Sequence, residues 1–183
     1  MPRSSLHVAS TAAVVCLTLA SASHGAVSDV ASNGFTLTID THIAAPPDKV
    51  YAALIEPGRW WSSDHTFSGD AKNMHLDAKA GGCWCETLPN GGSVVHLIVV
   101  YVDPGKAIRL RGALGPFQGL AVDGAMTWKV KAAADGTDLS ATYVLGGYNK
   151  DGFAELSKAA DGVLTIQFAR LKKLMETRSA DGH

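Results

Sequence analysis

The sequence predicts an α+β fold in which one long helix lies across the concave face of a curved antiparallel sheet. Residues 35–147 alternate apolar and polar side chains over short runs, which is typical of strands, and only one early helical stretch breaks this pattern. Residues 151–177 instead place apolar residues at steps of three and four, as an amphipathic helix does. Such a helix buries its apolar stripe against the sheet, so we expect a pocket between the two.

The composition is that of an ordinary globular domain. Of 183 residues, 46% are hydrophobic and 18% are charged, which supports one domain with a substantial core. The formal net charge of −1 gives no basic excess for binding nucleic acid or an anionic membrane. The sequence contains no glycine-rich phosphate loop, no nucleophile elbow and no paired-histidine zinc motif, so we expect no cofactor.

Residues 1–26 are expected to be a signal peptide. Arg3 gives a positive start, and the apolar run 8–20 has roughly the 7–15 residues of a signal core. That run is shorter than the about 20 residues that span a bilayer, so we expect no membrane segment in the mature chain. The small residues that fit cleavage are Ala22, Gly25 and Ala26. The alternative is that residues 1–26 form an N-terminal core helix.

If the signal peptide is removed, the mature protein is expected to be exported to the periplasm or the medium. It would consist of a single domain over residues 27–178 and a disordered tail over residues 179–183.

The elements follow in order along the mature chain. Residues 27–34 are small and polar and predict a mobile leader, and residues 35–39 alternate as a first strand. The Pro-Pro-Asp sequence at 46–48 starts a helix, which Pro57-Gly58 ends, and residues 59–62 predict a second short helix. Hairpin turns then separate further strands, so we expect about six to seven strands in all. These strands cover residues 74–78, 83–88, 93–102, 107–113, 122–132 and 137–146.

This order of elements resembles the START-like superfamily, also called SRPBCC, and its helix-grip fold. The resemblance is strongest to the polyketide cyclase/dehydrase and chaperone-activator-like branches, and it covers about residues 35–177. The segments on which the resemblance rests are residues 45–51, Trp60-Trp61, 81–86, 99–106, 136–139 and the final helix. The resemblance implies binding of lipids, sterols, polyketides or plant hormones, and in some members cyclisation or dehydration. Members share no catalytic motif, so no catalytic residue is carried over. A chaperone-activator role conflicts with export, because the partner is cytosolic.

Six residues are candidates for contact with an apolar small molecule: Trp60, Trp61, His96, Met126, Trp128 and Tyr143. The tryptophan pair follows the first helix, where the resemblance implies a pocket mouth, and the others lie on predicted strands. Each also has a structural interpretation as a core side chain, and for His96 a hydrogen-bonded structural role competes with an acid/base role. Glu86 shares the face of Trp84 and is expected to be exposed, and His65 is expected to be solvated in a loop.

Cys83 and Cys85 form the sharpest local signal. On a regular strand their β-carbons are about 6–7 Å apart, whereas a disulfide needs about 3.8 Å. The strand must therefore bulge, or the pair consists of free thiols, or the two hold a metal together with a histidine. His65, His75 and His96 are the available histidines, although C-x-C is not the usual zinc spacing.

Three functions remain open from the sequence. The first is an exported binding protein that holds an apolar or amphipathic ligand, lipid-, sterol- or polyketide-like, between sheet and helix. The second is a cyclase- or dehydratase-like enzyme that uses His96 or the cysteine pair, which requires those side chains to face the cavity. The third is a metal or redox protein built on Cys83 and Cys85.

Overall fold

One antiparallel sheet and one long helix make up most of the structure, a computed structural model that describes residues 24–177 and 179–181. Within these residues the strands are β1 (His24–Ala31), β2 (Gly34–Ile43), β3 (Met74–Leu76), β4 (Cys83–Thr87), β5 (Ser93–Asp103), β6 (Ala107–Arg111), β7 (Ala121–Ala133) and β8 (Gly136–Tyr148). The helices are α1 (Pro47–Leu54) and α2 (Ala154–Thr177), with short 3₁₀ segments η1 (Pro57–Arg59), η2 (Ser63–His65), η3 (Ala71–Asn73), η4 (Pro89–Gly91) and η5 (Gly115–Gly119).

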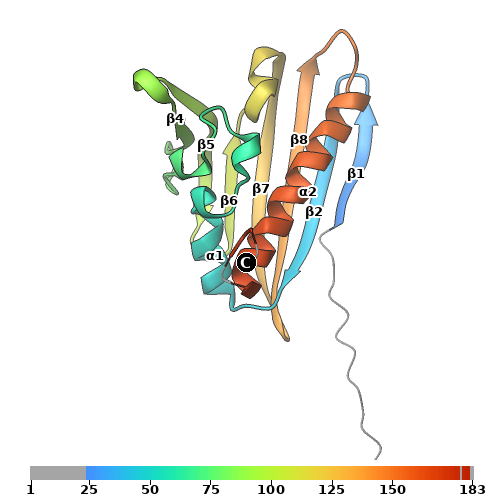
Figure 1. Ribbon diagram of the computed structural model, residues 1–183. Coiled ribbons are helices and arrows are strands. Elements are labelled where there is room, and N and C mark those ends of the chain that lie inside the picture. The colour runs from blue at the N-terminus through green and yellow to red at the C-terminus, as the bar shows by residue number, and fades with distance from the viewer. Residues whose placement is uncertain (1–23, 178, 182–183) are drawn as a thin grey trace, which may run out of the picture.

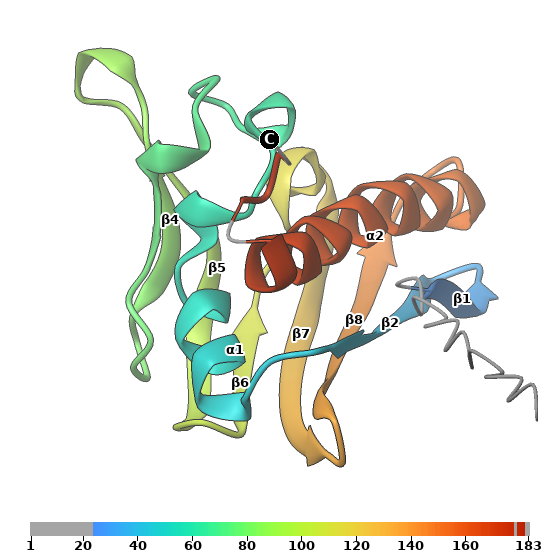
Figure 2. The ribbon, with the colours of Figure 1, turned by 60° about the horizontal axis from the view of Figure 1, so that its bottom comes forward.

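The eight described strands form a single sheet in the order β1-β2-β8-β7-β6-β5-β4-β3. Helix α2 lies across one face of this sheet, and α1 lies on the same side (Figures 1 and 2). The predicted α+β helix-grip architecture is therefore confirmed, with one strand more than the upper expectation.

Alternating side chains explain how the sheet and helix join. On β2, Phe35, Leu37 and Ile39 are buried at every second position, while the residues between them are partly exposed. Helix α2 covers this row and continues onto β1, and its Leu164 and Phe168 are almost fully buried. Burial of such a stripe, at about 1.5–3 kcal/mol for each large apolar side chain, is the main force that holds the helix on the sheet.

An aromatic cluster fills the core between α1, α2 and the middle of the sheet. Its members are Trp60, Trp61, Trp84, Trp128 and Phe168, whose contacting rings have centroids 4.9–6.3 Å apart. Edge-on and tilted rings at these distances stabilise one another beyond their burial.

The N-terminal part of the domain differs from the expectation. Residues 27–34, expected as a mobile leader, instead belong to β1 and its turn into β2. Gly25 allows this packing, because a β-carbon there would lie 2.1 Å from a carboxylate oxygen of Asp161 on α2. The apolar run of the expected signal peptide lies outside the described residues. Cleavage after Ala22 is the expected position that would leave β1 whole.

The C-terminal end also differs, because residues 179–181 were expected in a disordered tail. Ala180 is buried, and Arg170 on α2 forms an ion pair of 2.7 Å with Asp181. These contacts return the chain to the end of α2. Among the described residues, no helix combines the length and the apolar character needed to cross a bilayer.

Candidate functional site: an apolar cavity with a buried histidine–glutamate pair

A cavity of about 320 Å³ lies between α2, the sheet and two loops. Its lining is mostly apolar, and the polar side chains that reach it are few. The lining residues are Trp61, Asp64, His65, Thr66, Phe67, His96, Leu114, Gly115, Pro116, Phe117, Tyr143, Ala159, Ala160, Val163 and Leu164. The small side chains of Ala159 and Ala160 leave the space beside α2 that the loops enclose.

Gln167 on α2 fixes the first loop, residues 61–67. Its buried side-chain oxygen accepts a 2.7 Å hydrogen bond from the Ser62 amide, and its nitrogen lies 2.8 Å from His65 Nδ1. The Trp61 indole donates to the His65 carbonyl at 2.8 Å. His65 is thus held at the cavity wall, while its side chain stays exposed to solvent as expected for a loop histidine.

Tyr143 on β8 fixes the second loop. Its hydroxyl accepts a 3.0 Å hydrogen bond from the Leu114 amide and donates to the Gly112 carbonyl at 3.2 Å. Burial raises the pKa of this phenol far above its ordinary value. The hydroxyl therefore stays neutral and positions the loop before η5.

A β-bulge turns His96 toward the cavity. Trp84 pairs with Leu97 while Cys85 pairs with Val95, so His96 is the extra residue on β5. Both His96 and Leu97 consequently point inward and are almost fully buried. Strict alternation would have sent one of them to the outer face.

Glu86 on β4 is the partner of this histidine. Its carboxylate is fully buried, lies 2.9 Å from His96 Nε2, and accepts hydrogen bonds from the amides of Phe67 and Ser68. Burial alone would raise the pKa of Glu86, but the hydrogen bonds from Ser68, Phe67 and His96 outweigh it and leave the pKa below its ordinary value. The expectation that Glu86 is exposed was wrong, because the face that it shares with Trp84 is the inner one.

The pair defines the protonation state of His96. An ionised carboxylate only accepts hydrogen bonds, so Nε2 of His96 carries the proton that faces Glu86. Burial lowers the pKa of His96 despite the opposing effect of Glu86. Nδ1 is buried and has no hydrogen-bond partner in the described part of the chain. His96 is therefore a neutral imidazole that lines the cavity, and its buried Nδ1 is an acceptor without a partner.

The six candidate residues from the sequence divide into two groups. Trp61, His96 and Tyr143 line the cavity. Trp60, Met126 and Trp128 lie in the core and are not among the lining residues, so they are left out of the candidate site. Sequence reasoning missed Phe67, the loop at η5 and the alanines of α2. The one available signal was the pair of adjacent alanines at 159–160, whose small side chains interrupt the bulky apolar residues of the helix and leave space for a cavity.

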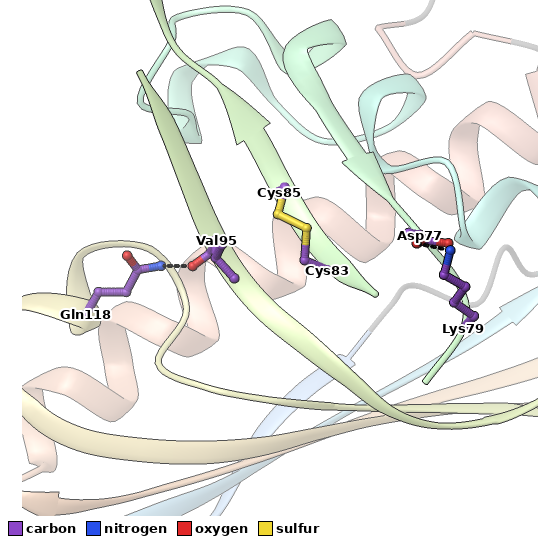
Figure 3. Close-up of a disulfide and its surroundings, with 6 residues drawn as sticks. All are labelled: Asp77, Lys79, Cys83, Cys85, Val95 and Gln118. Atoms are coloured by element: carbon purple, nitrogen blue, oxygen red, sulfur yellow. Dashed lines mark hydrogen bonds and ion pairs between the residues drawn. A yellow bond between two sulfur atoms is a disulfide. The ribbon is translucent and has the colours of Figure 1, made fainter. Parts of the chain in front are cut away.

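The two cysteines lie on the other side of the sheet. They form a disulfide with a Cα–Cα distance of 5.4 Å, opposite the bulge of β5 (Figure 3). The cysteines are thus neither free thiols nor on a strand that bulges itself, because the extra residue of the bulge lies on the neighbouring strand β5. Because Trp84 and Glu86 point inward from the same strand, the cysteines cannot take part in chemistry inside the cavity.

Comparison with known proteins identifies the family. The sequence profile of the family described as polyketide cyclase/dehydrase and lipid transport matches residues 34–176. The chain therefore belongs to this family, within the SRPBCC superfamily that the sequence resembles. A comparison with curated proteins finds no match.

Solved structures share the fold at low sequence identity. Protein MLL2253 from Mesorhizobium loti is 19% identical, with a TM-score of 0.56 over 77% of this chain and 96% of that one. CalU16 from Micromonospora echinospora is 15% identical, with a TM-score of 0.52 over 88% and 92%. The Aha1 dimer from Colwellia psychrerythraea is 16% identical, with a TM-score of 0.55 over 78% and 96%.

Proposed function

We propose that this protein is exported and binds an apolar or amphipathic small molecule in the cavity beneath α2. The carrying observation is the mostly apolar lining of the cavity, into which a neutral histidine projects. Ligand sites are typically apolar clefts of about 300–1,000 Å³ with a few placed polar groups. The volume here is near the lower limit, which favours a compact, polyketide-like ligand over a whole sterol or a long lipid chain.

A probe-binding experiment tests this function. The apolar dye 1-anilinonaphthalene-8-sulfonate should bind the folded protein with one-to-one stoichiometry. Ala160→Phe fills the cavity from α2 and should weaken binding at least tenfold. Ile166→Phe adds a ring to an exposed position of the same helix and should leave affinity unchanged. The absence of saturable binding, or equal affinity in both variants, would overturn the proposal.

Enzymatic activity is a second candidate, favoured by the pair of His96 and Glu86. A neutral imidazole whose Nε2 is held by a carboxylate, and whose Nδ1 has no partner, is arranged to remove a proton from a bound molecule. Cyclase- or dehydratase-like chemistry begins with removal of a proton next to a carbonyl group. In this mechanism His96 is the general base, and Glu86 fixes its tautomer and stabilises the imidazolium that forms.

Deuterium exchange separates an enzyme from a simple binding protein. An aromatic methyl ketone in heavy water should exchange its α-protons faster with the wild-type protein than in buffer. His96→Gln keeps a hydrogen-bond donor toward Glu86 but lacks the base, so it should lose the acceleration while it retains dye binding. If the variant accelerates exchange as well as wild type does, His96 is not the base.

A further inference from the structure

A second cluster of reactive side chains lies on the outer face of the sheet. His75 on edge strand β3 is the direct register partner of Cys85 on β4. One ring nitrogen of His75 and the sulfurs of Cys83 and Cys85 all lie within 4.8 Å of one another. His75 is exposed and Cys83 is half-buried, so solvent reaches the cluster from the side of the edge strand.

The cluster is independent of the cavity. Trp84 and Glu86 alternate with the cysteines along β4 and point to the opposite face. No member of the cluster is among the residues that line the cavity. A function of this cluster therefore needs no ligand beneath α2.

The disulfide contributes little as a structural crosslink. It joins residues only two positions apart, and the stabilisation that a crosslink gives grows with the length of the loop that it closes. The same proximity makes the two thiols of the reduced form a natural chelating pair. Their histidine neighbour supplies a third ligand of a type that accompanies thiolates in metal sites.

The distances also suit a metal ion. Zinc binds thiolate sulfur at about 2.3 Å and histidine nitrogen at about 2.0–2.1 Å, so tetrahedral ligands are separated by about 3.6–3.8 Å. The three ligand atoms already lie within 4.8 Å of one another. Reduction frees the sulfurs to move from bonding distance to this separation, and small side-chain rotations bring the imidazole into range.

We propose that the reduced protein binds one thiophilic metal ion, Zn²⁺ or Cu⁺, through His75, Cys83 and Cys85, and that oxidation to the disulfide releases it. An external dithiol reduces the protein disulfide. It supplies two electrons and two protons to Cys83 and Cys85, which become thiols, and is itself oxidised to a cyclic disulfide. Metal binding then displaces the thiol protons. In the reverse direction, a peroxide takes two electrons from the metal-bound thiolates and two protons from solvent. The products are the disulfide, the free ion and two water molecules.

The test compares reduced and oxidised full-length protein. The disulfide is reduced with an immobilised phosphine without air, and Co²⁺, Zn²⁺ and Cu⁺ are titrated separately against chromophoric chelators. Reduced wild type should bind one ion per chain and show a thiolate-to-cobalt charge-transfer band, whereas oxidised protein should bind none. The Zn²⁺ and Cu⁺ arms establish which ion binds more tightly.

Single substitutions assign the ligands. Cys85→Ser should abolish binding, and His75→Ala should weaken it at least tenfold, while His42→Gln, a histidine on distant β2, should behave as wild type. Because Cys85→Ser could impair folding, the decisive variant is His75→Ala on the exposed edge strand, checked by circular dichroism. Equal affinity in His75→Ala, one ion shared by two chains, or no binding to reduced wild type would each overturn the proposal. Dye binding in the cavity is measured in the same samples and should not change.

Discussion

His96→Leu should be among the most destabilising single substitutions in this protein. It leaves the fully buried Glu86 carboxylate without its imidazole partner. Because His96 is neutral, the substitution removes a hydrogen bond to a buried carboxylate, which typically contributes about 1.5–3 kcal/mol. Glu86 retains its hydrogen bonds from the Phe67 and Ser68 amides, so we expect a cost of about 2–3 kcal/mol. His96→Gln retains a donor toward the carboxylate and should cost about 1 kcal/mol.

The pH dependence of stability gives the same pair a second signature. Burial lowers the pKa of His96 below its ordinary 6.5, so the unfolded chain takes up this proton at a higher pH than the folded chain does. Its contribution to stability is therefore complete above about pH 6.5 and is lost as the pH falls toward the lowered pKa. The other titratable side chains that reach this cavity are Asp64, His65 and Tyr143. The pKa of Glu86 is lowered as well, so its contribution to stability is lost only at more acidic pH. His96→Gln should therefore remove only the loss of stability that begins near neutral pH.

Urea denaturation followed by tryptophan fluorescence measures both effects. The three proteins should show similar denaturant slopes, with midpoints in the order wild type, His96→Gln, His96→Leu. Below pH 6.5 the gap between wild type and His96→Gln should narrow. Two results would contradict the assignment of an ionised Glu86 beside a neutral His96. One is an equal loss of stability in the two variants, and the other is a difference in stability between wild type and His96→Gln that does not change with pH.

Three further substitutions and one treatment test the packing. Gly162→Ala should raise the free energy of unfolding by about 1 kcal/mol, because a β-carbon at this exposed position on α2 meets nothing within 4 Å. Gly124→Ala should instead lower it by about 1–3 kcal/mol, since the β-carbon would lie 2.7 Å from a backbone carbonyl; thermal unfolding compares the two. Tyr143→Phe should cost about 1–3 kcal/mol and speed amide exchange in the loop before η5, which loses both of its hydrogen bonds to the phenol. Reduction of the Cys83–Cys85 disulfide should cost only about 1–2 kcal/mol by urea denaturation, because the closed loop is so short.

Much of the fold could be predicted from the sequence because its strongest signals are periodic. The alternation along β2, β7 and β8 and the apolar stripe of α2 depend only on local geometry, and they gave the architecture correctly. Strand β1 was missed because its small and polar residues carry little pattern of their own. Its place depends on pairing with β2 and on the close approach of α2 at Gly25.

The candidate site was harder to predict, because it depends on a departure from periodicity. The bulge at His96 changes which side chains of β5 face inward, and alternation alone does not reveal where a bulge occurs. Glu86 lies on the face of Trp84, as the alternation indicated, but a single strand does not show that this face is the buried one. The partner of Glu86 is ten residues away on the next strand, and the two meet only through the register of β4 with β5.

Mapping a bound ligand by nuclear magnetic resonance tests the central claim most directly. The claim predicts nuclear Overhauser contacts between a bound apolar probe and the methyl groups of Ala160, Val163 and Leu164, with a shift of the Trp61 indole signal. Contacts confined to the outer face of the sheet, or a probe that binds without any contact to α2, would contradict it.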